Sequence, residues 1–467
     1  MRCTEEHTKN LRIAYVGGGS RGWAWGFMAD LALDEQICGT VCLYDIDQEA
    51  AWRNKRIGDG LSEHTQVKSR WRYEVADSLK AALMGADFVV ISILPGTFEE
   101  MEGDVHMPER LNVYQSVGDS VGPGGLIRAM RTLPMMAEIA AAVRDYAPDA
   151  WVINYTNPMT TCMRALYEVY PGIHAFGCCH EVFGTQKLLA SMLEDQCGIE
   201  GVTRQEIKIG VLGINHFTWL SSATYQGMDL FPIYRAFAVK YHETGYTKGM
   251  DSNWMNSHFA CNHRVKFDLF LRYGLIAAAG DRHLAEFLPP WYLKDAETAR
   301  QWGFSLTPVS WRKADLKERL ARQQRLLDGS ETLDLNGSGE EGHLLIKALL
   351  GLGDMVSNVN IPNRGQIENL PLGAVVETNA LFRKDGISPV CAGRLPAALD
   401  ALVTRHVLNQ EATVKAALTC DRQLALNTFL NDPLMGAVGL AEGEKLFDDM
   451  MRHTAAYLPK GWKLQDR

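Results

Sequence analysis

Short apolar runs alternate with longer segments of mixed polarity along the first 200 residues. The apolar runs predict strands at 11–16, 41–44, 72–75, 87–91, 151–154 and 174–177. The segments between them predict helices at 23–33, 48–61, 77–84 and 126–146. Strands that alternate with helices are typical of a doubly wound parallel sheet. We therefore expect residues 1–200 to form a Rossmann-like α/β domain.

Residues 201–467 do not continue this regular alternation. Apolar runs at 206–213 and 373–378 predict strands, and the segments 291–329, 342–351 and 395–418 are predicted to be mostly helical. The sequence contains no internal repeat and no coiled-coil heptads. We expect residues 201–467 to form a second, mixed α/β domain that completes a substrate and metal cleft with the first.

A glycine-rich turn, Gly17-Gly18-Gly19-Ser20-Arg21-Gly22, lies between the first predicted strand and the first predicted helix. Gly17, Gly19 and Gly22 match the dinucleotide fingerprint, in which the backbone and a helix N-terminus approach a pyrophosphate, and Ser20 lies in the same turn. Asp45 ends the second strand, 23 residues beyond Gly22. A carboxylate there suits a ribose 2'-hydroxyl and repels a 2'-phosphate, so the pattern predicts NAD rather than NADP. The three glycines alone also fit a purely structural turn.

Composition narrows the classes of partner. The 467 residues are 46% hydrophobic and 22% charged, with a net charge of -9, and they contain no basic cluster of the kind that nucleic acid needs. No apolar stretch is long enough to span a membrane, and the N-terminal residues do not form a secretory signal. The ten cysteines are scattered, without a C-x-x-C pair. We expect a cytoplasmic protein with reduced thiols and with neither nucleic acid nor membrane as a partner.

Polar side chains follow several of the predicted strands. Asn157 follows the strand at 151–154, Cys179 and His180 follow 174–177, and His216 follows 206–213. A Cys thiolate and a His imidazole suit a borderline divalent metal such as manganese, iron, cobalt or zinc. The separation of 37 positions is outside any short metal-ligand spacing, so a buried Cys179 and a hydrogen-bonded His216 are the alternative. Asp119, in a glycine-dense turn, fits a turn residue as well as a site residue.

Together these segments resemble glycoside hydrolase family four, whose members depend on NAD and a divalent metal. The resemblance extends over nearly the whole chain. It rests on seven segments in order: the glycine turn at 17–22, Gly118-Asp119-x-x-Gly122-Pro123-Gly124-Gly125, Asn157-Pro158, Gly177-x-Cys179-His180, Gly213-x-Asn215-His216, Asp281-x-His283-x-x-Glu286 and Asn360-Ile361-Pro362-Asn363.

The resemblance implies hydrolysis of an alpha-glycosidic bond without net redox change. The scheme that most glycosidases follow, with one pair of carboxylates on either side of the scissile bond, does not apply to this family. In its members, NAD oxidises the C3 hydroxyl of the sugar, a base removes the C2 proton, and the leaving group is eliminated from C1. Water then adds, and the hydride returns to C3.

The resemblance also assigns roles. Cys179 and His216 match the family's metal ligands, with manganese or another divalent transition metal expected, and Asn157 matches a substrate-binding asparagine. His180 stands where some members carry an acid that protonates the leaving group, and a histidine can do this near neutral pH. We also count Asp119, in the matched glycine-rich segment, among the catalytic residues.

The base is the role that the resemblance fixes least. Members that cleave phosphorylated sugars use a tyrosine in the region of 279–287, and this chain has none there. Asp281 is our first choice, because relatives with neutral or acidic sugars carry an acid at a comparable place. His283 and Tyr273 are reserves. Asp281 also fits a structural partner of Arg282 or Arg272.

The run from Cys179 to Gln186 resembles the branch that acts on uronic acids, the alpha-galacturonidases and alpha-glucuronidases. A uronate carboxylate needs a cation, and the sequence does not choose among Arg128, Arg131, Arg264, Arg282 and Arg364. We name Arg282, with Asn157, as substrate-binding. The alternatives are an alpha-galactosidase or alpha-glucosidase of the same family, a plain NAD-dependent sugar-acid dehydrogenase that releases NADH, or a nucleotide-binding sensor. Relatives form dimers or tetramers, so we expect a homo-oligomer.

Overall fold

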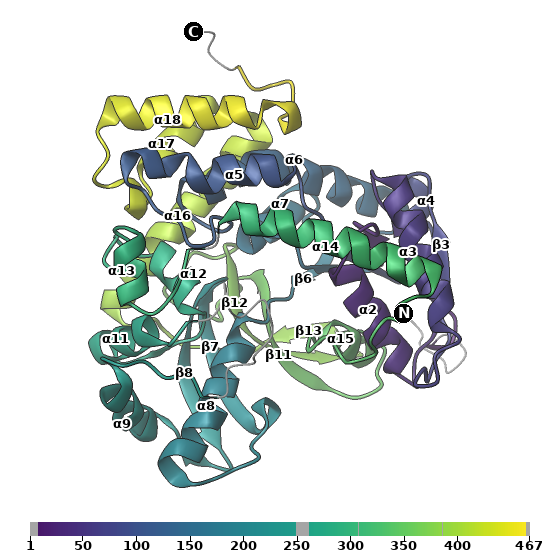
Figure 1. Cartoon of the computed structure of the whole chain (residues 1–467), viewed down its shortest axis with the longest axis horizontal. Helices are drawn as coiled ribbons and strands as arrows, with labels where there is room; N and C mark the ends of the chain where they lie inside the picture. The colour runs from purple at the N-terminus through teal and green to yellow at the C-terminus, as the bar shows by residue number, and fades with distance from the viewer. Residues whose placement is uncertain (1–7, 249–260, 307, 385, 464–467) are drawn as a thin grey trace.

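A nine-stranded sheet lies at the centre of the fold, in the order β13-β12-β11-β6-β5-β4-β1-β2-β3 (Figure 1). The structure is a computed structural model, and it describes residues 8–248, 261–306, 308–384 and 386–463. Strands β1 to β6 are mutually parallel, whereas β11, β12 and β13 add to β6 in antiparallel order. The strands are β1 Leu11–Val16, β2 Gly39–Tyr44, β3 Arg72–Val75, β4 Phe88–Ile91, β5 Trp151–Asn154, β6 His174–Gly177, β11 Met355–Pro362, β12 Val375–Arg383 and β13 Gly386–Pro389.

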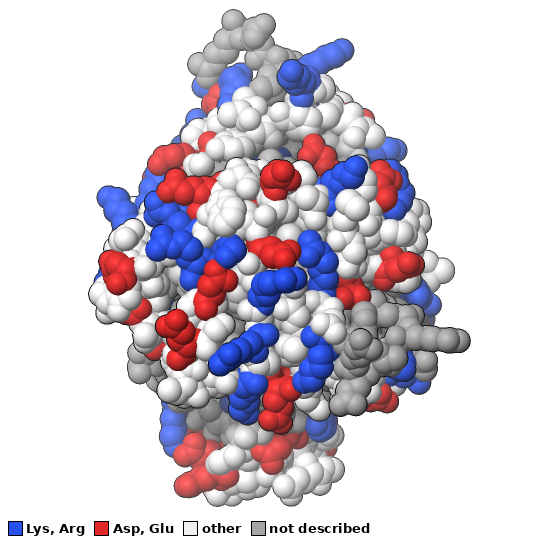
Figure 2. Space-filling view, turned by 90° about the vertical axis from the view of Figure 1, so that its right-hand side faces the viewer, with Lys and Arg blue, Asp and Glu red and all other residues white. Residues whose placement is uncertain are grey.

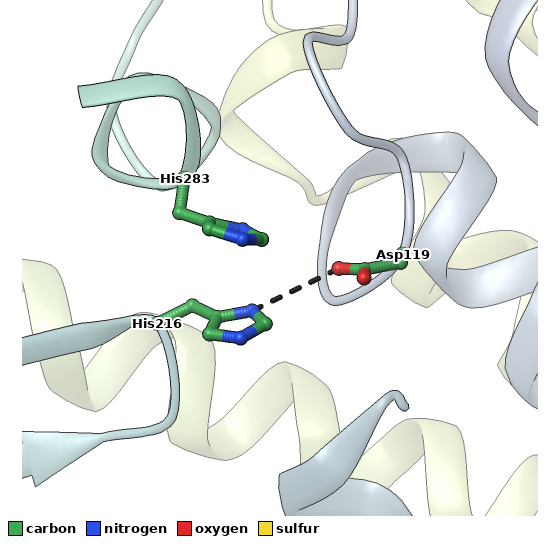
Figure 3. Close-up of side chains that lie close together, drawn as sticks. All are labelled: Asp119, His216 and His283. Carbon is green, nitrogen blue, oxygen red and sulfur yellow. Dashed lines mark ion pairs between the residues drawn. The ribbon is translucent and has the colours of Figure 1, made fainter. Parts of the chain in front are cut away.

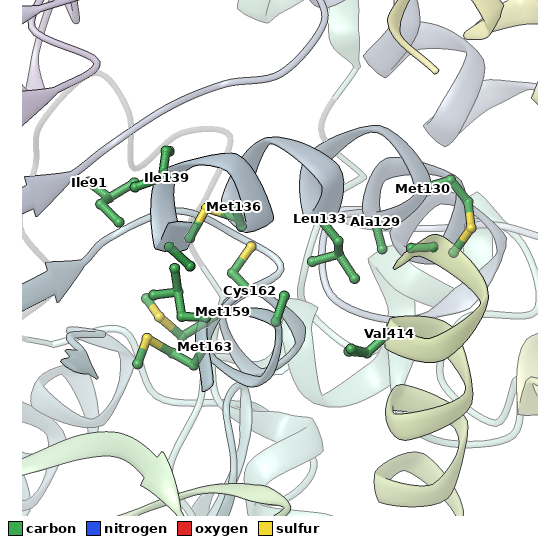
Figure 4. Close-up of a cluster of buried hydrophobic side chains, with 14 of the residues drawn as sticks. Ile91, Ala129, Met130, Leu133, Met136, Ile139, Met159, Cys162, Met163 and Val414 are labelled. Atoms are coloured by element: carbon green, nitrogen blue, oxygen red, sulfur yellow. The ribbon is translucent and has the colours of Figure 1, made fainter. Parts of the chain in front are cut away.

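Helices cover both faces of this sheet, because successive strand side chains point to opposite faces. Ile13 and Tyr15 pack in one core with α2, α3 and α15 (Gly342–Leu349), and Ala14 and Val16 pack in another with α6, α7 and α16 (Ala397–Thr419). Figure 4 shows the second core where α6, α7 and α16 meet. The Rossmann-like α/β prediction is confirmed. The helices of the first half are α2 Trp23–Leu33, α3 Gln48–Leu61, α4 Leu79–Leu83, α5 Phe98–His106, α6 Gly122–Tyr146, α7 Met159–Val169 and α8 Glu181–Cys197.

The second half forms the predicted mixed α/β part, around a smaller antiparallel sheet of β7 Ile207–Ile214, β8 Phe217–Tyr225, β9 Met228–Asp229 and β10 Ile276–Ala277. Its helices are α9 Phe231–Tyr241, α11 Arg264–Tyr273, α12 Asp281–Glu286, α13 Ala296–Gln301, α14 Val309–Asp328, α15 Gly342–Leu349, α16 Ala397–Thr419, α17 Arg422–Leu430 and α18 Leu440–His453. Short 3-10 turns are η1 Pro108–Leu111, η2 Arg204–Glu206, η3 Pro433–Met435 and η4 Ala455–Tyr457. The domain boundary at residue 200 stays a prediction, because β11 to β13 extend the first sheet.

The segment between β4 and α6 is one in which the sequence predicted no helix or strand. It contains α5, which begins with a capping box in which Thr97 and Glu100 satisfy each other's backbone N–H groups. Helix α6 begins at Gly122, four residues earlier than predicted. A Cβ on Gly124 would lie 2.7 Å from the carbonyl oxygen of Asp104. Close packing of α6 on α5 therefore requires glycine, and it outweighs the low helix propensity of this residue.

Basic and acidic side chains are interspersed on the face shown in Figure 2. Such mixing gives no extended patch of a single sign on that face. Within the described ranges, every helix is too short or too polar to cross a membrane.

Candidate active site

The glycine turn packs tightly against the ends of β2 and β4. Gly17 adopts φ 95°, and a Cβ there would lie 2.0 Å from the carbonyl oxygen of Ser92. Gly19 donates its N–H to Asp45 Oδ2 at 2.8 Å. Only glycine fits such close approaches, which is the requirement of a dinucleotide turn. The structure thus brings together the predicted cofactor residues Gly17, Gly19, Ser20, Gly22 and Asp45.

Helix α14, from the second half of the chain, reaches this turn. Arg319 Nη1 donates to the carbonyl oxygen of Arg21 at 2.9 Å, and Arg21 Nε donates to Gln323 Oε1 at 3.1 Å. Arg319 Nη1 lies so close to Gly22 that a Cβ on this glycine would be 2.3 Å from it. Sequence reasoning missed α14, because nothing in the glycine motif indicates which distant helix lies over it.

Replacing Asp45 with alanine is expected to weaken NAD binding about 10- to 100-fold, since a hydrogen bond to a charged group contributes about 1.5–3 kcal/mol. Titration of NAD into the protein, followed by nucleotide fluorescence or calorimetry, measures this. The exposed Glu49, on the first turn of α3, supplies the control Glu49→Ala. Equal affinity for NAD in Asp45→Ala and wild type would remove Asp45 from the cofactor site.

His216 occupies the tight turn between β7 and β8, where Ile214 pairs with Phe217. It adopts φ 64°, a left-handed conformation that most side chains avoid. Its buried ring places Nδ1 at 2.7 Å from Ser120 Oγ. The same atom lies 3.8 Å from Asp119 Oδ1 (Figure 3). Ring contacts at Nδ1 fix the orientation of a metal-binding histidine. Nε2, on the opposite side of the ring from Asp119, is therefore the atom that can bind a metal.

Cys179 follows β6 and shares its surroundings with His216. Burial raises the pKa of Cys179 well above its usual range, and the carboxylates of Glu377 and Glu181 raise it further. Burial lowers the pKa of His216 to about 4, and the same two carboxylates oppose this shift. The predicted pair thus lies beside the same two acids, although the ligand role of Cys179 and His216 stays a prediction.

Glu377 is a buried acid that forms no ion pair with a basic residue of the described chain. Its carboxylate accepts from Asn358 Nδ2 at 2.7 Å and from Asn215 Nδ2 at 3.0 Å, and burial raises its pKa. A buried carboxylate held by amides alone gains from a nearby cation. Sequence reasoning missed Glu377, and its signal was a charged residue inside the apolar strand at 373–378.

His283 stacks on His216, with ring centroids 3.7 Å apart and planes inclined by 29° (Figure 3). Ligand atoms of Asp119, His216 and His283 lie within 4.8 Å of one another. The lone pair of an imidazole nitrogen lies in the plane of its ring, so the lone pairs of two stacked rings point in nearly parallel directions. Both rings therefore cannot bind the same ion at a metal–nitrogen distance of about 2.0–2.1 Å. His283 Nδ1 is buried without a hydrogen-bond partner in the described part of the chain. His283 is therefore better placed to contact substrate than to share a metal with His216.

Asp119 lies between these rings and the predicted substrate residue Asn157, whose Nδ2 donates to Asp119 Oδ2 at 3.2 Å. Burial alone would raise the pKa of Asp119, but the imidazoles of His216 and His283 and the guanidinium of Arg128 lower it below its usual range. Asp119 is therefore ionised. The Oδ1 atom of Asn157 is buried and lacks a partner among the described residues, so it can accept a hydrogen bond from a ligand.

Asp281 is fully buried under the first turn of α11. Its two oxygens accept the backbone N–H groups of Val265 and Lys266, each at 3.2 Å. Burial raises its pKa to about 6. This is the position of a helix cap, and the carboxylate also lies within 4.8 Å of ligand atoms of Cys261 and His263. Its role as a base stays a prediction.

Arg282 donates from Nη2 to the carbonyl oxygen of Ser116 at 2.6 Å and from Nε to that of Ser305 at 3.2 Å. Burial lowers its pKa to about 10. The guanidinium thus links the loop before α6 to the segment before α14. Its contact with substrate stays a prediction.

His180 lies at the exposed edge of the site, with 53% of its side chain accessible. Its Nδ1 is 2.7 Å from Glu340 Oε1, and its ring lies 6.1 Å from that of Trp23. Loss of hydration on the side of the ring that faces the protein pushes the pKa of His180 down, but the hydrogen bond and charge of Glu340 outweigh this and raise it. Sequence reasoning missed Glu340, which lies 160 positions away in the chain. Nε2 of His180 is the atom left to donate a proton.

Comparison with known proteins gives a consistent result over the whole chain. Residues 12–195 match the description "Family 4 glycosyl hydrolase", and residues 211–435 match its C-terminal domain. A protein of Thermoanaerobacterium saccharolyticum named alpha-galacturonidase is 59% identical over 466 residues, covering 100% of both chains.

Two solved structures are similar. A crystal structure of a Bacillus subtilis protein has a TM-score of 0.90 and 53% identity, and the match covers 95% of this chain and 100% of that one. A 6-phospho-alpha-glucosidase from gut microorganisms, in complex with NAD and Mn²⁺, has a TM-score of 0.81 at 19% identity, covering 97% of this chain and 100% of that one. The second likeness shows a shared fold.

Proposed function

We propose that this chain, which belongs to family 4 of the glycosyl hydrolases, hydrolyses alpha-glycosides of galacturonic acid with NAD and a divalent metal as cofactors. The observation that carries the proposal is the 59% identity, over the full length, to a relative named alpha-galacturonidase. The sequence resemblance of residues 179–186 to the uronic acid branch supports the same substrate class.

The described residues fit both cofactors. The glycine turn leaves no room for a Cβ at Gly17, and Asp45 lies at the end of β2 to bind a ribose. The thiol of Cys179 and Nε2 of His216 form a donor set for a divalent transition metal, and the acids Glu181 and Glu377 act on both. When bound, NAD supplies a hydride acceptor and the metal supplies a Lewis acid.

Two residues of the chain move protons in this proposal. His283, through its unpartnered Nδ1, accepts the proton from C2 of the sugar, and Asp281 is the alternative base. His180 donates a proton from Nε2 to the oxygen of the leaving group, while Glu340 holds Nδ1 and raises the pKa of the ring.

Three residues orient the site. Asp119 and Ser120 hold the ring of His216 from the Nδ1 side, and Asn157 offers its Oδ1 to a sugar hydroxyl. Binding a sugar beside these groups excludes water from buried charges, which strengthens the interactions that position the substrate.

Release of the aryl group from an aryl alpha-galacturonide tests the function. In reducing buffer, release is expected only when NAD and manganese are both present, without build-up of NADH. Aryl alpha-glucuronide and alpha-galactoside serve as comparison substrates, and the galacturonide is expected to have the highest kcat/KM.

Stoichiometric NADH formation without aryl release would instead indicate a sugar-acid dehydrogenase. A higher kcat/KM for the alpha-galactoside would move the chain to the neutral-sugar branch of the family.

A further inference from the structure

A uronate carboxylate in a partly desolvated site needs a cation that is not already engaged by protein groups. Four of the five candidate arginines are engaged or lie at the surface. Arg131 forms a buried ion pair with Asp104, and Arg282 donates to two backbone carbonyls. Arg264 also donates to two backbone carbonyls, and Arg364 is exposed. These four therefore do not provide a buried cation for a ligand.

Arg128, on the second turn of α6, is different. Only 7% of the residue is exposed. Its Nε is buried without a partner, and its guanidinium forms no hydrogen bond or ion pair with residues that the structure describes. A buried guanidinium without a partner is unusual, because the loss of its hydration is not compensated. An anionic ligand would provide that compensation.

The position of Arg128 relates it to the site. Its charge acts on Asp119, the carboxylate that also lies beside His216 and His283. Asp119 thus has both the imidazole pair and the guanidinium of Arg128 among its neighbours. A pyranose ring carries its C2 and C3 oxygens at one edge and its C5 substituent across the ring. A sugar whose C2 and C3 face the imidazoles can therefore extend its C5 carboxylate toward Arg128.

A second positive charge lies nearby. Arg312, on α14, interacts electrostatically with both Asp119 and Arg128. It also acts on Arg282 and is acted on by Arg319, so three guanidinium groups repel Arg312, whereas Asp119 and Asp315 attract it. Bringing like charges together is unfavourable unless an anion joins them. A carboxylate on the substrate reduces this repulsion, whereas a neutral hydroxymethyl group does not.

On the basis of the proposed function, we propose that Arg128 binds the C5 carboxylate of the uronate and so selects a galacturonide over a galactoside. Arg312 adds to the positive potential at the same end of the substrate. Arg128 is then a specificity-determining residue, separate from the groups that act at C2 and C3.

Arg128→Met tests this with a pair of substrates that differ only at C6. Its kcat/KM for an aryl alpha-galacturonide is expected to fall about 100-fold or more, since truncating one partner of a desolvated charge pair is strongly unfavourable. Its kcat/KM for the aryl alpha-galactoside is expected to stay within about threefold of wild type. Arg128→Lys should recover part of the loss, because it keeps the charge without the planar fork.

Arg144→Met is the matched control, because Arg144 lies on the same helix but at the surface, beside Asp145. It should leave both substrates unaffected. Thermal midpoints and NAD affinity of each variant show whether the fold is kept. If Arg128→Met does not fold, Arg128→Lys is used to compare inhibition by D-galacturonate and D-galactose, and a selective loss for D-galacturonate is expected.

Equal losses for both substrates in a folded Arg128→Met variant would overturn the proposal, as would no loss for either. If the wild-type protein releases no aryl group from the galacturonide, the proposed function fails. Binding of D-galacturonate to wild type and Arg128→Met by calorimetry then decides the role of Arg128 separately. Weaker binding to the variant supports the role, and equal binding overturns it.

Discussion

Replacing Cys179 with serine is expected to lower metal-dependent turnover more than about 1,000-fold, since a Lewis acid contributes several kcal/mol to such reactions. Serine removes the thiolate, which manganese-like metals bind, and keeps nearly the same volume. NAD affinity should change little, because the glycine turn and Asp45 lie on other strands. Turnover is measured against manganese concentration, and NAD binding is measured separately.

The neighbouring Cys178 provides a matched control. Cys178 belongs to the hydrophobic core beneath the sheet, so Cys178→Ser should lower stability slightly and keep metal-dependent turnover. His216→Ala should lower metal-dependent turnover by as much as Cys179→Ser does. Asp119→Asn should have a smaller effect, about 10- to 100-fold on metal affinity, if Asp119 only orients His216. Wild-type manganese dependence in Cys179→Ser would remove Cys179 from the metal site.

Local patterns in the sequence predicted most of the first domain. The helices at 23–33 and 48–61 have the predicted bounds, because each directly follows a clear strand and a short turn. The first is almost wholly apolar, whereas the second has a regular polar face. The pattern did not predict α5 or the early start of α6. Both depend on packing between these two helices, where Gly124 meets the backbone of Asp104. Strand β11 was also missed, and its pairing with β6 joins Asn360 to Gly177, which lie 183 positions apart in the chain.

The predicted site residues came from motifs at strand ends, and the structure adds groups that no motif contains. Glu340 contacts His180 from a distant loop, and Arg319 contacts the glycine turn from α14. Such pairs require the tertiary fold, since neither partner has a pattern of its own. The sequence likewise offered five arginines for a uronate. Only burial and hydrogen bonding distinguish Arg128 from the other four.

Replacing His283 with asparagine is expected to slow exchange of the C2 hydrogen with solvent about 100- to 10,000-fold, the usual contribution of a general base. His283 lies against His216 and Asp119, and its Nδ1 has no partner in the described structure. Exchange is followed by NMR of the galacturonide in deuterated buffer with NAD and manganese. Metal and NAD affinities measured alongside show whether the site is otherwise intact.

Asp281→Asn separates the two candidate bases. Because both oxygens of Asp281 accept backbone N–H groups at the start of α11, this variant should lower the thermal midpoint, and the folded fraction should keep most of its exchange rate. Loss of exchange in a folded Asp281→Asn variant, with exchange retained in His283→Asn, would assign the base to Asp281 as the sequence first indicated. It would also require the α11 N-terminus to move away when substrate binds, since a fully buried carboxylate cannot otherwise reach C2.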